Sequence, residues 1–222
     1  MRPLAPPLAA ALALALAAAP ARAGAAPTVT CHCFKDRSFD PADPPAADPY
    51  ILAVTRSSLL SAAFAVSKGG LVRAVMTGTA PEDLWVAHLA ASRTGRSASW
   101  FLDALGETGS WRAALAGAKG LPPAFAAALA RGATGVELAA LAVDDVLASR
   151  LGADPAGLRA LRAAGATSEQ VIVATFLAPR LKAPAADLFS RFKDGKATWG
   201  TLLRDAGLAP EQIEDAVRKS VR

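Results

Sequence analysis

Residues that typify strands and reactive sites are scarce in this chain of 222 residues. It contains one tyrosine, two histidines and two cysteines, and aromatic residues make up only 6% of it. No stretch alternates β-branched or aromatic residues with polar ones, which argues against a β-sandwich or barrel. Two cysteines are too few for a disulfide-rich scaffold. Apolar residues make up 53% and charged residues 19%, a balance that excludes an intrinsically disordered chain.

The N-terminal segment, residues 1–23, has the pattern of a secretory signal peptide. Arg2 supplies a positive start, residues 8–19 are apolar and uncharged, and Ala21 and Ala23 are the small residues that a signal peptidase requires. We expect cleavage after Ala23 and export to the periplasm or the extracellular medium. The alanine-rich signal is typical of bacteria.

Two further properties of the mature chain bear on its partners. Cleavage removes Arg2 and Arg22, so the formal net charge falls from +5 to +3. A mildly basic chain without a basic recognition stripe gives no reason to expect a nucleic-acid partner. No later apolar run reaches the ~20 uncharged residues of a membrane span, so the mature chain is expected to be soluble.

Residues 24–48 differ in composition from the rest of the mature chain. They hold both cysteines and four prolines, and they show no apolar periodicity. We expect an extended arm here. An all-α domain is expected over residues 49–222, where helix start and stop signals dominate.

Helix caps are easily recognised in this domain. The segments that begin at Thr79, Thr134 and Thr167 each fit a capping box. Asp48 and Asp154 each precede a proline suited to the first helical position. Glycines stand where left-handed helix ends are expected; these are Gly78, Gly120, Gly132, Gly165 and Gly207. The predicted helices lie near 50–67, 70–77, 80–92, 98–106, 111–118, 123–131, 136–151, 155–164, 168–178, 184–193, 198–206 and 210–220.

Two segments of the domain also resemble each other in sequence. Residues 70–87 match residues 157–174 at a constant offset of 87, and with one inserted residue Trp111 falls over Trp199. We interpret this as an internal repeat, about 61–123 and 148–210. The sequence therefore predicts an array of tandem short helical hairpins, in which each hairpin buries its apolar face against its neighbours.

The sequence Cys31-His32-Cys33 is the one dense cluster of reactive side chains. Four interpretations remain open. In three of them the cysteines form a disulfide, which is a local structural one, a strained and redox-active one, or a link between two chains. Alternatively, Cys31, His32 and Cys33 ligate copper or zinc, with a fourth ligand such as His88 or Asp36. No cofactor is predicted outside this metal alternative.

The four tryptophans divide into two pairs. Trp111 and Trp199 share a repeat position, which favours a core role for both. Trp85 and Trp100 are the candidate surface anchors, because exposed tryptophans often contribute most to binding. His88, the second histidine, is expected to pack at a helix interface.

No arrangement of residues indicates catalysis. The chain lacks Gly-x-Ser-x-Gly. We assign no catalytic role to Glu137, Asp144 and Asp145, because Glu137 already serves as the N3 residue of a capping box and acid–base pairs need carboxylates that converge on a pocket. We therefore expect a non-catalytic binding or scaffold protein of the bacterial cell envelope, whose partner is another envelope protein or a second copy. The alternative is a small thiol-redox or metal-handling protein that uses Cys31, His32 and Cys33.

Overall fold

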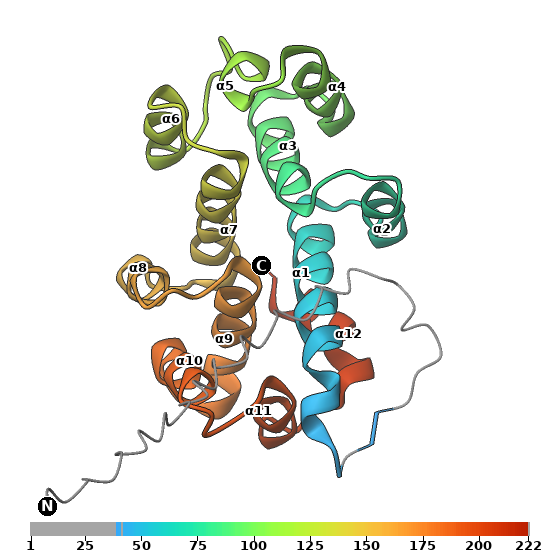
Figure 1. Ribbon diagram of the computed structural model, residues 1–222, viewed down its shortest axis with the longest axis vertical. Helices are drawn as coiled ribbons and strands as arrows, with labels where there is room; N and C mark the ends of the chain where they lie inside the picture. The colour runs from blue at the N-terminus through green and yellow to red at the C-terminus, as the bar shows by residue number, and fades with distance from the viewer. Residues whose placement is uncertain (1–38, 41, 222) are drawn as a thin grey trace, which may run out of the picture.

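The computed structural model describes residues 39–40 and 42–221, and this part of the chain contains helices but no strand (Figure 1). The all-α class is confirmed. The helices are η1 (Pro44–Ala47), α1 (Asp48–Phe64), α2 (Lys68–Met76), α3 (Pro81–Thr94), α4 (Ala98–Thr108), α5 (Trp111–Ala114), α6 (Pro123–Ala130), α7 (Gly135–Leu151), α8 (Pro155–Ala163), α9 (Ser168–Leu181), α10 (Ala185–Lys193), α11 (Trp199–Asp205), η2 (Pro210–Gln212) and α12 (Ile213–Ser220).

Four longer helices form the centre of the molecule. In Figure 1, α1 and α3 make one column and α7 and α9 make the other. Helix α3 packs on α7, and α1 packs on α9. The shorter helices lie outside these columns, with α2 and α4 next to one and α6, α8 and α10 next to the other. Helix α12 packs along α1.

Helix lengths recur along the chain. Helices α1 and α7 have 17 residues each, α2 and α8 have 9, and α3 and α9 have 14. Each pair starts 87 residues apart, from Asp48 and Gly135 onward. This spacing agrees with the offset in the sequence. The internal repeat stays a prediction, and on these boundaries it would begin at residue 48 rather than near 61.

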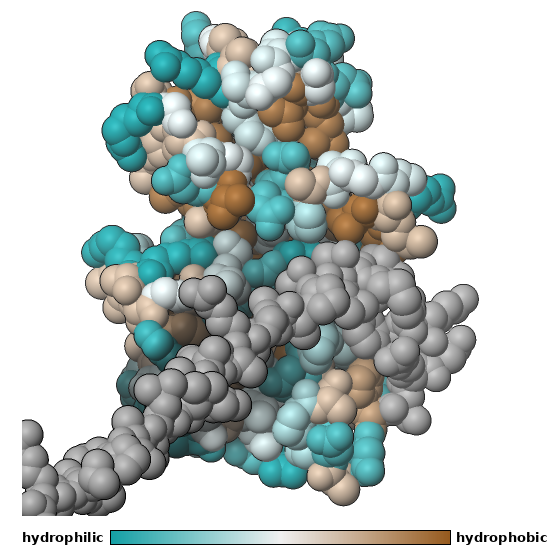
Figure 2. Space-filling model, viewed as in Figure 1, coloured by the Kyte–Doolittle hydropathy of each residue, from teal (hydrophilic) through white to brown (hydrophobic). Residues whose placement is uncertain are grey.

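Large apolar side chains fill the space between the helices. Trp85, Phe101, Phe125 and Trp199 are each at most 2% exposed. Burying one such side chain contributes roughly 1.5–3 kcal/mol. Packing of this kind is needed because helices of two or three turns are marginal alone. Hydrophobic residues remain on the surface over α2 and α4, where Figure 2 shows them bordered by hydrophilic ones.

Several of the predicted helix caps are present. The capping boxes at Thr134 and Thr167 have both of their hydrogen bonds, and the Asp154 carboxylate accepts the N–H groups of residues 156 and 157. The box predicted at Thr79 is wrong, because α3 begins one residue later and its N-cap is Ala80. Asp48 is not an N-cap either, since the 3-10 turn η1 leads directly into α1.

The segment before α1 belongs to the packed domain. Ala47 is 2% exposed, and the rings of Phe39 and Tyr50 lie 4.9 Å apart. Turn η1 packs so closely on α11 that a Cβ at Gly200 would lie 1.8 Å from the Pro44 carbonyl oxygen. The packing therefore extends to the N-terminal side of the boundary expected at residue 49.

Candidate functional site

Two surface cavities meet at Arg93, near the C-terminal end of α3. One, which we call the Trp100 groove, has a volume of about 330 Å³. The other, the His88 cleft, has a volume of about 620 Å³. The Trp100 groove is lined by Arg93, Thr94, Arg96, Trp100, Phe101, Ala114, Ala116, Gly117, Ala118 and Lys119. The His88 cleft is lined by Ala63, Phe64, Ala65, Val66, His88, Leu89, Ala91, Ser92, Arg93, Ala98, Asp145, Val146, Ser149 and Arg150.

Local structure holds Trp100 at the surface. Gly95 ends α3 in a left-handed conformation, and the Ser97 hydroxyl then accepts the Trp100 N–H at 3.1 Å as the N-cap of α4. The indole is packed edge-on against the buried Phe101, and the Arg96 guanidinium lies 4.0 Å from the ring centre. Trp100 is nevertheless 42% exposed. Trp100 is therefore an accessible aromatic side chain whose ring is held by contacts with Phe101 and the Arg96 guanidinium.

The charges that line the Trp100 groove have one sign. Arg93, Arg96 and Lys119 line it, and among the described lining residues there is no carboxylate. The small residues Ala116, Gly117 and Ala118 also line the groove. Positive charge in a concave surface raises the local concentration of anions. The groove is therefore suited to an anionic group.

Arg93 connects the two cavities and also the two columns. Its Nη2 donates to Asp145 Oδ2 at 2.9 Å, which joins α3 to α7. The side chains are 41% and 24% exposed, so water screens this pair and it contributes little to stability. Arg93 lines both cavities, and Asp145 neutralises part of its charge.

The His88 cleft combines an apolar wall with polar groups. The partly exposed Phe64 and Val66 supply apolar surface, and the His88 ring is stacked on Phe64 with ring centres 5.9 Å apart. Burial lowers the pKa of His88, because the protonated imidazolium loses hydration. The imidazole is therefore neutral at neutral pH. Its neighbour in the cleft, Ser149, is exposed.

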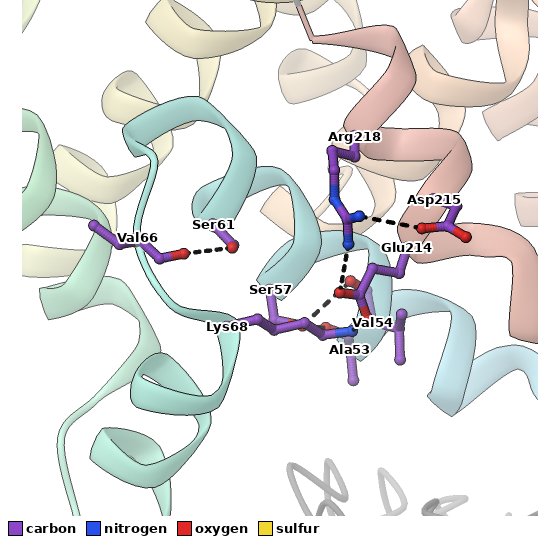
Figure 3. A network of polar contacts seen from close by, with 9 residues as sticks. All are labelled: Ala53, Val54, Ser57, Ser61, Val66, Lys68, Glu214, Asp215 and Arg218. Carbon is purple, nitrogen blue, oxygen red and sulfur yellow. Dashed lines mark hydrogen bonds and ion pairs between the residues drawn. The ribbon is translucent and has the colours of Figure 1, made fainter.

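A polar network fixes the end of α1 that lines the cleft (Figure 3). The Ser61 hydroxyl donates to the Val66 carbonyl at 2.6 Å and so closes the turn after α1. Two residues later, the Lys68 ammonium donates to Glu214 of α12 at 2.6 Å. Hydrogen bonding from Lys68 lowers the pKa of Glu214, so this carboxylate is charged at neutral pH. The turn that carries Val66 into the cleft is thus fastened to α12.

Only one of the two predicted surface anchors lies at the surface. Trp100 is exposed, but Trp85 is 2% exposed and packs in the core, so it is not a surface residue. The error arises because the apolar face of α3 is buried against both α1 and α7, as the T-shaped contact of Trp85 with Phe64 illustrates. Trp111 and Trp199 are buried, at 4% and 0%, as expected.

Other predicted residues lie outside the described part of the chain. These are Cys31, His32 and Cys33, together with Asp36, so the structure does not describe their pairing or any metal that they hold. Within residues 39–40 and 42–221, no three histidine or acidic side chains are grouped closely enough to hold a metal ion.

The sequence analysis missed the cations around Trp100. None of the three cations, Arg93, Arg96 and Lys119, was predicted as a site residue. Only Arg96 is close to Trp100 in sequence, so a search for basic residues within a few positions of each exposed aromatic would have found it. Lys119 lies 19 positions away, and no local pattern indicates that it shares a groove with Trp100.

Comparison of this chain with known protein families, with curated protein sequences and with solved structures finds no match. Each helix in the described part is too short or too polar to span a lipid bilayer.

Proposed function

We propose that this chain is an exported, non-catalytic binding protein of the bacterial cell envelope, whose partner places an anionic group in the Trp100 groove. One observation carries the proposal: the exposed Trp100 lies in a groove lined by three cations and, among the described residues, no carboxylate. Stacking on the indole restrains the Arg96 guanidinium while its N–H edge can still donate to an oxyanion. Less conformational entropy is then lost on binding.

Tryptophan fluorescence can test this proposal directly. The other three tryptophans are at most 4% exposed, so changes on adding a ligand report mainly on Trp100. We expect a hexaglutamate peptide to change the emission, with an affinity that falls as salt is added. Hexalysine should have no such effect. Equal responses to the two peptides would show that the groove does not select anions.

Charge reversal gives a matched pair of variants. Lys119→Glu places a carboxylate in the groove, and we expect it to weaken hexaglutamate binding about tenfold. Lys219→Glu makes the same change of net charge on an exposed part of α12 and should leave the affinity unaltered. If both variants weaken binding equally, only the overall charge matters and the proposed groove is wrong.

The thiol or metal function of Cys31, His32 and Cys33 stays a prediction. The double variant Cys31→Ser with Cys33→Ser separates it from the binding function. A binding protein of the proposed kind keeps its affinity for hexaglutamate in this variant, whereas a thiol or metal protein loses its activity.

A further inference from the structure

We propose that the partner's binding segment is an acidic peptide with one large apolar side chain, which enters the His88 cleft while neighbouring carboxylates lie in the Trp100 groove. This inference rests on the proposed function and specifies the partner. It starts from the position of Arg93, which lines both cavities. A single extended segment that passes Arg93 can therefore reach both.

The cleft has the size and the surface for a side chain. Its volume of about 620 Å³ lies within the ~300–1,000 Å³ typical of ligand sites and exceeds the volume of one aromatic ring. Phe64 and Val66, which are both partly exposed, supply the apolar contacts. The fixed turn at Val66 means that this wall is already formed before a partner binds.

The polar groups of the cleft favour a peptide over a hydrocarbon chain. The hydroxyls of Ser92 and Ser149 and the ring of His88 line the same space as the apolar wall. Peptide N–H and C=O groups can pair with these side chains, whereas a hydrocarbon would displace their water without replacing its hydrogen bonds. The small residues of the Trp100 groove, Ala116 to Ala118, leave room for a main chain to lie close to the groove wall.

The distribution of charge favours an acidic peptide over a polyphosphate or a nucleic acid. Three cations line one cavity, whereas the other combines Arg93, Arg150 and Asp145 with an apolar wall. A uniformly charged polymer would leave this apolar wall unused. A peptide can change from charged to apolar side chains within one or two residues.

Three peptides and two rival ligands test the inference on the mature chain. The probe peptide has five glutamates with a phenylalanine at the centre, and its counterparts carry alanine at the centre or lysine in place of glutamate. Dodecanoate and polyphosphate represent the rival ligands. Trp100 fluorescence reports on the groove. The NMR signals of the His88 ring, assigned with the variant His88→Gln, report on the cleft.

We expect the phenylalanine peptide to bind at least tenfold more tightly than the alanine peptide, because an aromatic side chain is removed from water. Only the phenylalanine peptide should shift the His88 signals. The variant Ser149→Phe fills the cleft from an exposed position and should abolish the tenfold advantage while leaving the alanine peptide unaffected. Ser190→Phe, at an exposed position on α10, is the matched control and should change neither affinity.

Failure of this inference can be told apart from failure of the proposed function. Equal affinities for the phenylalanine and alanine peptides, with a normal Trp100 response, overturn the inference and leave the proposed function standing. Dodecanoate or polyphosphate binding more tightly than either peptide also overturns it. No Trp100 response to any acidic peptide overturns both.

Discussion

The contact of α3 with α7 and the contact of α9 with α1 join helices of the same lengths, but they differ in chemistry at corresponding positions. At the offset of 87, His88 corresponds to Thr175 and Asp145 corresponds to Ser58. Thr175 and Ser58 are 8% and 4% exposed, and neither hydroxyl has a hydrogen-bond partner among the described residues. The positions that line an open cleft where α3 meets α7 are therefore part of the closed core where α9 meets α1.

Two arginines show how this difference arises. Arg180 corresponds to Arg93, but its guanidinium lies 4.1 Å from the Phe176 ring centre and donates to the Ala216 carbonyl and the Ser220 hydroxyl of α12. Arg93 is exposed and pairs with Asp145 instead. The same side chain thus fastens a helix in one half and lines two cavities in the other.

The largest expected effect comes from disrupting the packing of η1 against α11. The variant Gly200→Ala would place a Cβ 1.8 Å from the Pro44 carbonyl oxygen, so η1 must move away from α11. We expect the free energy of unfolding to fall by about 2–4 kcal/mol, measured by urea denaturation.

A matched glycine in the first half serves as the control. Gly106 lies within α4, and a Cβ there would meet nothing within 4 Å. Gly106→Ala should stabilise the protein by roughly 0.5–1 kcal/mol, because alanine is the better helix former. Equal effects of Gly106→Ala and Gly200→Ala would contradict the close packing of η1 on α11.

The two arginines give the next largest difference. Arg180→Ala removes the hydrogen bonds that hold the end of α12 and should cost about 1–2 kcal/mol of unfolding free energy. Arg93→Ala should cost less than about 1 kcal/mol, because its ion pair is exposed, yet it should weaken hexaglutamate binding. The comparison fails if Arg93→Ala proves the more destabilising of the two in thermal or urea unfolding.

Asp48 makes the contact between α1 and α11 sensitive to pH. Its carboxylate accepts the Gly200 N–H at 2.7 Å, and burial raises its pKa above the ordinary value of 3.8. The folded state then holds the carboxyl proton more tightly than the unfolded chain does. The free energy of unfolding of the protein therefore falls as pH rises above about 4. Asp48→Asn keeps the acceptor without the buried charge and should be at least as stable as the native protein at pH 7.

That advantage of Asp48→Asn should vanish below about pH 4, where the native carboxyl is protonated. Asp48→Ala lacks the acceptor and should be destabilised by about 1 kcal/mol. Urea unfolding of the three proteins at pH 3.5 and 7 checks both expectations, and a constant difference between Asp48→Asn and the native protein would refute the role of burial.

The smallest expected effect concerns His88. Because burial lowers its pKa below 6.5, the unfolded chain binds a proton more readily, and stability falls as pH drops below 6.5. His88→Thr installs the corresponding residue of the second half and should flatten this part of the stability curve. The measurement is urea unfolding between pH 7 and 5, and an unchanged slope in the variant would assign the pH dependence to other groups.

Much of the helical structure could be predicted because its signals are local. Thr134 and Thr167 sit three residues before the side chains that complete their capping boxes, so a few positions specify each helix start. The helix expected over residues 168–178 is longer in the structure, since α9 continues through Pro179 to Leu181. Tertiary packing of this helix outweighs one unfavourable residue near its end.

The candidate site could be predicted only in part. Trp100 was among the expected anchors, but so was Trp85, and the sequence cannot distinguish them because both lie on amphipathic helices. Their exposure depends on the neighbours of each helix: α3 lies between α1 and α7, whereas α4 lies outside the central columns.

The sequence by itself determined the all-helical class, most helix boundaries and the offset of 87, because these follow from backbone preferences and hydrogen bonds within a few residues. Only the tertiary structure decided that Arg93 and Lys119 share a groove with Trp100, that Trp85 is buried, and that Asp48 binds Gly200. These relations join residues up to 152 positions apart. They depend on how packed helices minimise exposed apolar surface, which no local pattern encodes.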